Sequence, residues 1–143
     1  MFVLAISAGC TSVSVKPVDR DAYPIASICI EENKAVNHSG FLPMLENNLS
    51  QHSIQSQRYS GLIPSGCDYT LHYVANWAWD LAAYLRDADI SVRKGSDIIG
   101  NGNFHLRGGG GFALTKFDSA ESKINPVLDK VFVQFPKTSN GAE

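Results

Sequence analysis

A long alternating stretch in the middle of the chain predicts its central strand. From Cys67 to Leu81 the sequence reads CDYTLHYVANWAWDL, in which aromatic or aliphatic residues occupy every second position. Successive side chains of a strand point to opposite faces of a sheet, so this pattern predicts a strand with one strongly aromatic face. A strand of this length is above average and is typical of the centre of a sheet.

Shorter patterns on either side predict four more strands and a helix. Strands are expected over 25–30, 54–59, 82–93 and 98–106, with a hairpin turn at 94–97 between the last two. The first helix is expected to open at Ser39 or Gly40 and to end near His52. Its apolar stripe consists of Phe41, Leu42, Leu45 and Leu49.

A second apolar stripe near the C-terminus predicts another helix of about three turns. The stripe consists of Ile124, Val127, Leu128, Val131, Phe132 and Phe135. Asn125 as the cap with Pro126 in the first turn is a suitable start, and Asp118 or Ser119 could open an earlier turn. Pro136 is expected to end the helix.

The order β-α-β-β-β-β-α predicts an α+β fold. We expect a two-layer sandwich, in which a mostly antiparallel sheet of about five strands carries both helices on one face. The other face should be solvated or covered by a partner. A single domain is expected over 24–136, followed by a flexible tail over 137–143.

The N-terminus carries a candidate lipidation site. Residues 1–9, MFVLAISAG, are apolar or small and lead directly to Cys10, after which the chain turns polar. This arrangement resembles the C-terminal half of a bacterial lipoprotein signal peptide. The resemblance implies that residues 1–9 are a signal remnant, that Cys10 is acylated, and that residues 10–23 form a tether. It also implies an envelope protein, located at the outer membrane and facing the periplasm because neither of the two positions after Cys10 is Asp. The alternative is a buried N-terminal strand with an incidental cysteine.

The two remaining cysteines, Cys29 and Cys67, form an even pair in a chain that is expected to be exported. Export would place them in an oxidising compartment, where disulfides persist. We therefore predict a Cys29–Cys67 disulfide, the alternative being two separate buried thiols. The net charge of −2 gives no reason to expect a nucleic-acid partner.

No group of residues has the spacing of a catalytic or metal site, and no cofactor is expected. The run Gly108, Gly109, Gly110, Gly111 lacks the GK[ST] and G-x-G-x-x-G patterns of phosphate loops. It is either a bulge or bend, or a flat patch that could admit a partner strand. Trp77 and Trp79 share a face and are expected to be buried under the helices, with a ligand platform as the alternative. His72 and His105 could face the same way on neighbouring strands, most simply as a surface pair.

Together these segments resemble a family of small uncharacterised bacterial lipoproteins. The motifs that carry the resemblance are 29–33, 67–69, 79–80 and 105–111, within a region from about Ile25 to Val133. The resemblance implies no transferable activity. We expect a non-enzymatic, membrane-anchored envelope protein that binds a partner, the alternative being a binder of a small molecule or lipid.

Overall fold

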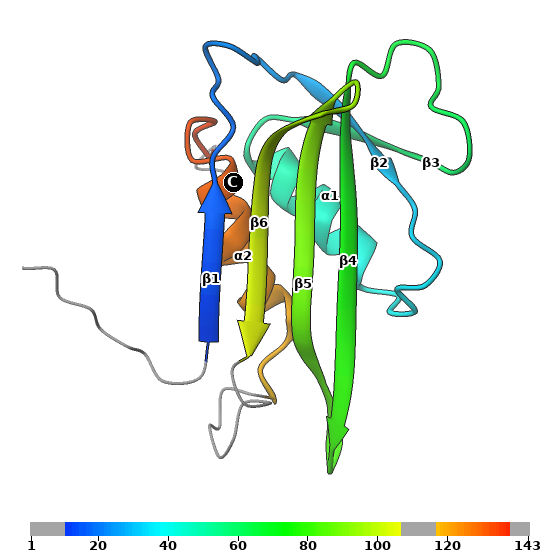
Figure 1. Ribbon diagram of the computed structural model, residues 1–143, viewed down its shortest axis with the longest axis vertical. Helices are drawn as coiled ribbons and strands as arrows, with labels where there is room; N and C mark the ends of the chain where they lie inside the picture. The colour runs from blue at the N-terminus through cyan, green and yellow to red at the C-terminus, as the bar shows by residue number, and fades with distance from the viewer. Residues whose placement is uncertain (1–10, 107–116, 138–143) are drawn as a thin grey trace, which may run out of the picture.

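The computed structural model describes residues 11–106 and 117–137 (Figure 1). Its elements, in chain order, are β1 Thr11–Lys16, β2 Ser27–Glu31, α1 Phe41–Gln51, β3 Gln55–Tyr59, β4 Tyr69–Asp80, β5 Ala82–Lys94, β6 Asp97–Leu106 and α2 Ala120–Val131. The predicted α+β class is confirmed, and so is the predicted order from the second strand onward.

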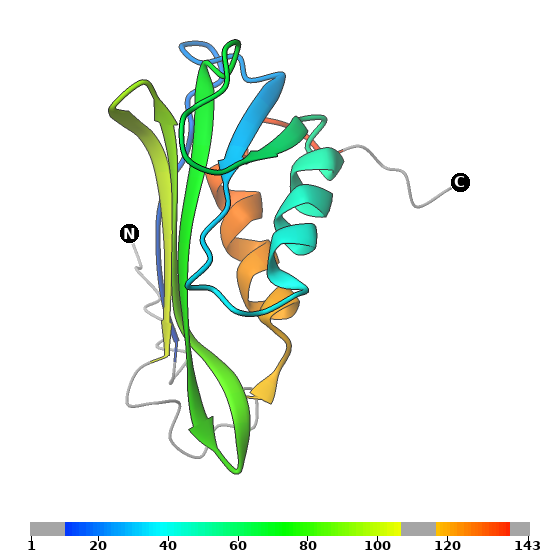
Figure 2. The ribbon, with the colours of Figure 1, turned by 90° about the vertical axis from the view of Figure 1, so that its right-hand side faces the viewer.

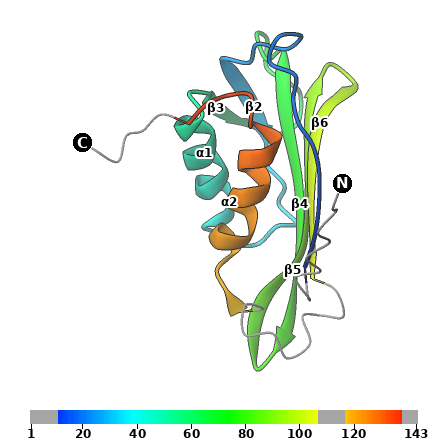
Figure 3. The same cartoon turned by 90° about the vertical axis from the view of Figure 1, so that its left-hand side faces the viewer.

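All six strands form one mixed sheet in the order β1-β6-β5-β4-β2-β3. β4, β5 and β6 make an antiparallel meander, and β1 adds antiparallel to β6. β2 and β3 run parallel to each other, and β2 joins β4 in parallel. Both helices lie on the same face of the sheet, which leaves the other face uncovered by either helix (Figures 2 and 3).

The expected tether over 10–23 is wrong for the residues that the structure describes. Thr11–Lys16 is strand β1, paired along its length with β6, so the sheet has one strand more than expected. Val18 follows this strand and is fully buried, and its backbone N–H donates to the carbonyl of Val131 at 2.9 Å. Burial of Val18 and the β1–β6 hydrogen bonds therefore hold this segment against the domain.

The core lies between the sheet and both helices, and the close approach of α2 to β6 requires a glycine. A Cβ added at Gly102 would lie 2.5 Å from Val127 Cγ1 and 2.9 Å from Val131 Cγ2. These distances are below van der Waals contact, so only glycine lets the helix approach β6 this closely. The valines belong to the predicted apolar stripe of α2, which is buried as expected.

The second helix begins earlier than the Asn125 cap would place it. Ser119 is the N-cap, and its hydroxyl oxygen accepts from the backbone N–H of Ser122 at 3.1 Å. Pro126 therefore lies inside the helix. The first helix begins after Gly40 and ends at His52, as predicted.

A polar network around the buried side chains of Asn48 and His52 joins the two helices near their C-terminal ends. His52 lies between the Phe135 carbonyl and the Asp129 carboxylate, with Nε2 3.0 Å from Asp129 Oδ1. Asn48 Nδ2 donates to the same Oδ1 at 3.0 Å, and Lys137 Nζ lies 2.9 Å from Oδ2. Lys137 is thus anchored to α2, although the tail was expected to begin there.

The β4–β5 hairpin extends past the ends of both helices (Figure 2). A bulge interrupts its pairing between Asn76 and Trp77, and a tight turn at Leu81 joins the strands. Leu81 has φ +65°, a left-handed conformation that is uncommon for a bulky residue. The hairpin therefore ends in an arm that the helices do not cover.

Candidate functional site

The uncovered face of the sheet, which we call the outer face, is polar and carries a network of hydrogen-bonded side chains. On β4, β5 and β6 the outward positions alternate with core residues, as the burial of each strand shows. These outward residues are Thr70, His72, Val74, Asn76, Asp87, Asp89, Ser91, Arg93, Asn101, Asn103 and His105. The face that was expected to be solvated or covered by a partner therefore consists mainly of groups that can form hydrogen bonds.

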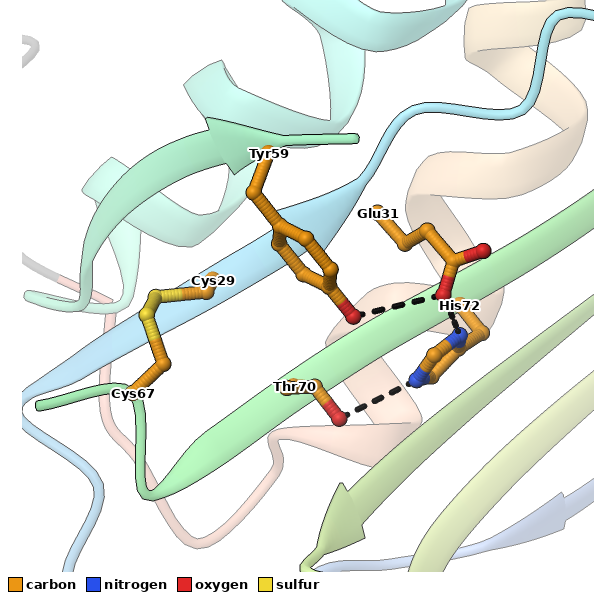
Figure 4. The surroundings of a disulfide bond; sticks show 6 residues. All are labelled: Cys29, Glu31, Tyr59, Cys67, Thr70 and His72. Carbon is orange, nitrogen blue, oxygen red and sulfur yellow. Dashed lines mark hydrogen bonds and ion pairs between the residues drawn. A yellow bond between two sulfur atoms is a disulfide. The ribbon is translucent and has the colours of Figure 1, made fainter. Parts of the chain in front are cut away.

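Five of its residues form what we call the His72 cluster: Glu31, Tyr59, Thr70, His72 and Arg93. His72 Nδ1 lies 2.9 Å from Glu31 Oε2, and His72 Nε2 lies 3.1 Å from Thr70 Oγ1. The Tyr59 hydroxyl donates to the same Glu31 oxygen at 3.3 Å. Figure 4 shows this chain of contacts beside the disulfide.

The partners of His72 define its proton arrangement. An ionised carboxylate can only accept, so His72 Nδ1 carries the proton that points at Glu31. Nε2 is then free to accept from the Thr70 hydroxyl. Burial, and secondarily the charge of Arg93, lower the pKa of His72, although Glu31 opposes the shift. His72 is therefore neutral at pH 7, which agrees with the inferred tautomer.

Glu31 and burial also act on Tyr59. Burial is the larger cause that raises the pKa of the Tyr59 phenol, and the charge of Glu31 and its hydrogen bond add to it. Tyr59 therefore stays protonated and donates to Glu31 at any physiological pH.

Two open hollows of about 300 Å³ each flank His72 on the outer face. One is bordered by Glu31, Glu32, Asn33, Lys34, His72, Tyr73 and Val74. The other is bordered by His72, Tyr73, Val74, Asp89, Ser91, Arg93, Ile98 and Asn101. Arg93 Nε is buried and finds no hydrogen-bond partner among the residues that the structure describes. The second hollow therefore has an unsatisfied cationic donor at its edge.

The order Thr70–His72–Glu31 is that of a hydroxyl nucleophile, a base and an orienting carboxylate. Nucleophilic catalysis also requires that a substrate can reach the hydroxyl. Thr70 is only 3% exposed, within β4 and next to Cys29 on β2. The geometry thus suits a polar network that shapes a binding surface better than a reacting hydroxyl.

The predicted disulfide is confirmed: Cys29 and Cys67 are joined, with their Cα atoms 5.8 Å apart. Cys29 pairs with Thr70 where β2 meets β4, in a seam with two paired positions, Cys29–Thr70 and Ile30–Leu71. The disulfide therefore links β2 to the chain just before β4 and supports the seam beside the His72 cluster.

The two tryptophans have different environments. Trp77 is half-buried, stacks on His38 with ring centroids 4.9 Å apart, and meets Phe41 edge-on. Trp79, expected to share the buried face, is 76% exposed, because the hairpin has by then passed the end of the helix layer. The prediction of burial under the helices is therefore confirmed in part for Trp77 and wrong for Trp79.

Other expected sites lie outside the described residues or are separated by the fold. Cys10 and the run Gly108–Gly111 belong to the undescribed residues. Strand β6, which leads into that run, pairs with both β1 and β5. His72 and His105 do share the outer face, but β5 lies between their strands, so they are not neighbours.

The sequence interpretation missed most of the His72 cluster. Its members come from β2, β3, β4 and β5, and each occupies an outward position where the sequence around it gives no sign of a site. Within the described parts of the chain, no group of three or more His, Cys, Asp or Glu residues could hold a metal ion. Neither described helix is long and apolar enough to cross a membrane.

Comparison with known proteins shows a shared fold. No protein-family model and no curated protein matches this chain. A PelC dodecamer from Paraburkholderia phytofirmans is similar in structure, with 12% identity, a TM-score of 0.51, and coverage of 91% of this chain and 100% of that one. A single-residue variant of that PelC dodecamer gives 10% identity and a TM-score of 0.52, covering 90% and 99%. At this identity the likeness shows the fold alone.

Proposed function

We propose that this chain is a non-enzymatic lipoprotein of the bacterial envelope, anchored by acylated Cys10 and facing the periplasm at the outer membrane. It binds another envelope component on its outer face. The observation that carries the binding role is this face itself, which both helices leave bare and which is hollowed on either side of His72. The Cys29–Cys67 disulfide supports export, since such bonds persist in oxidising compartments.

The anchor is tested by the intact mass of the protein isolated from bacterial membranes, before and after reduction. The expected species begins at Cys10, carries a diacylglycerol and an acyl chain, and gains two hydrogens on reduction. Cys10→Ala is the matched control and should leave the protein unlipidated and soluble after cell lysis. An unmodified chain that retains Met1 would refute the anchor.

The binding role is tested by photocrosslinking in living cells. A crosslinking amino acid at Asn101, on the outer face beside the second hollow, should give a discrete adduct. The same amino acid at Asn47, on the exposed side of α1, is the control and should give none. Equal adducts at both positions, or none at either, would contradict a role for the outer face. A second copy of this chain is one candidate partner, because the PelC structures of the same fold are dodecamers.

The second candidate function is binding of a small anionic molecule or of a lipid headgroup in the hollow beside Arg93. It is favoured by the buried Nε that has no partner in the described structure. A guanidinium donor of this kind forms its strongest hydrogen bonds with carboxylate or phosphate groups. Isothermal titration with phosphate or a small carboxylate should give a signal that Arg93→Gln removes.

A further inference from the structure

The β4–β5 hairpin ends in two apolar side chains that the fold leaves in solvent, which we call the apolar tip: Trp79 and Leu81. Trp79 is 76% exposed and Leu81 is 91% exposed. Leu81 occupies the turn with φ +65°, where glycine or asparagine would avoid the steric cost of about 1 kcal/mol. A bulky apolar residue in this conformation is locally strained, and strained residues cluster at functional contacts.

The arm that carries the tip is held firmly at its base. Trp77 stacks on His38, with an interplanar angle of 7°. On the opposite strand, β5, the Leu85 carbonyl accepts a hydrogen bond from Lys123 Nζ of α2 at 3.3 Å, and the same Nζ lies 5.9 Å from the centre of the Tyr84 ring. The tip is therefore presented at a fixed place relative to the sheet.

The tip lies at the end of the molecule where β1 begins (Figure 1). The register places Thr11 beside Leu106, Asp87 beside His105, and Asn76 beside Asp87. Thr11 is therefore level with Asn76 and Trp77 across the sheet. The remaining part of the arm, up to Leu81, extends roughly 13 Å further at about 3.3 Å per residue.

We propose that the apolar tip inserts into the headgroup region of the membrane that holds the lipid anchor; this rests on the proposed acylation of Cys10. Cys10 precedes Thr11 directly, so the acyl chains would hold this end of the sheet at the bilayer. Each polar layer of a bilayer is roughly 5–8 Å thick, which a 13 Å arm can enter. Trp is enriched at this depth because its ring is apolar and its indole N–H can bond to water or headgroups.

The insertion sets orientation and adds little to attachment. The acyl chains attach the protein, while the tip supplies a second contact away from the anchor and so fixes the direction of the sheet. Strand β4 then leads away from the bilayer, and His72 lies roughly 30 Å from Leu81 along it. The His72 cluster and both hollows would thus face the periplasm at a set distance from the membrane.

The test uses lipidated protein purified from membranes and reconstituted in phosphatidylethanolamine–phosphatidylglycerol vesicles with brominated acyl chains. Trp77→Phe leaves Trp79 as the single tryptophan, and its emission should be quenched at least two-fold relative to unbrominated vesicles. Trp79→Phe leaves Trp77 and is the matched control, with quenching below a quarter. Adding Leu81→Ser to Trp77→Phe should weaken quenching of Trp79.

The outcomes separate the tip from the anchor. Absence of Trp79 quenching in protein whose mass shows acylation overturns the insertion and leaves the anchor standing. If the native protein carries no acyl chains, the anchor proposal fails, and the Cys10 thiol is coupled instead to a maleimide lipid; quenching of Trp79 then decides the insertion alone. A doubled mass in detergent that Leu81→Ser abolishes, without quenching in vesicles, would assign the tip to a second copy and overturn the proposal.

Discussion

Removing the disulfide should cost this domain a large share of its stability. The perturbation is Cys29→Ala with Cys67→Ala, made in a Cys10→Ala background so that the parent protein and the variant both lack the third thiol. The bond joins positions 38 apart in sequence. In the chain-entropy model a closed loop of this length constrains the unfolded chain by roughly 4 kcal/mol at 25 °C. The free energy of unfolding of natural domains is about 5–15 kcal/mol, so the expected loss is a quarter or more of the total.

The assay is urea unfolding followed by circular dichroism and tryptophan fluorescence. With a slope of about 2 kcal/mol per M, the midpoint should fall by roughly 2 M. Reduction of the disulfide-containing protein should reproduce the shift, because both changes release the same loop. In the variant, the unfolding transitions reported by circular dichroism and by fluorescence should no longer coincide. Without the disulfide, only two paired positions, Cys29–Thr70 and Ile30–Leu71, hold β2 against β4. If the free energy of unfolding fell by less than about 1 kcal/mol both in the variant and on reduction, the loop argument would be refuted.

Three further perturbations test other features. His72→Gln should flatten the pH dependence of stability. Because the pKa of His72 is lowered in the folded protein, the unfolded chain binds the proton more tightly, and the native protein loses stability as the pH drops below about 6.5. Urea titrations at pH 7 and pH 5 measure this loss in the native protein and in the variant. Gly102→Ala should destabilise by about 1–3 kcal/mol because its Cβ would overlap Val127, whereas Asn103→Ala on the outer face should change little in the same unfolding assay. Leu81→Gly should leave the melting temperature unchanged or slightly higher, since it relieves the left-handed strain and removes an exposed side chain. A clear loss of stability in this last variant would contradict a role for Leu81 outside the fold.

The elements with strong periodicity could be predicted from the sequence because their burial is local in origin. The stripe of α2 and the alternation of β4 each record which side faces the core. The disulfide could be predicted from compartment and parity, without knowledge of the fold. The residue at which α2 begins could not be predicted from the sequence alone. Asn125–Pro126 and Ser119 are both good start signals, and only packing selects between them.

The remaining features depend on distant pairing. β1 is short and follows a candidate anchor, so its alternating serines and valines were interpreted as a linker. Only its pairing with β6 makes this segment a strand. The exposure of Trp79 depends on how far the helices reach along the sheet. The alternation of polar and apolar residues gives no information about that reach. The His72 cluster requires Glu31, Tyr59 and Arg93 to lie in register across four strands, and none of the three has a local signal.

The pairing of β1 with β6 also has a consequence for the order of events if the chain is exported and acylated as proposed above. Thr11 pairs with Leu106, so the first strand cannot join the sheet until the chain as far as Leu106 has emerged and can fold. A chain that emerges from its N-terminus therefore keeps the segment next to Cys10 extended and accessible throughout translocation. Under that proposal, processing enzymes at the membrane would act on this segment early, and pairing of β1 with β6 would then bring the folded domain up to its anchor as a last folding step.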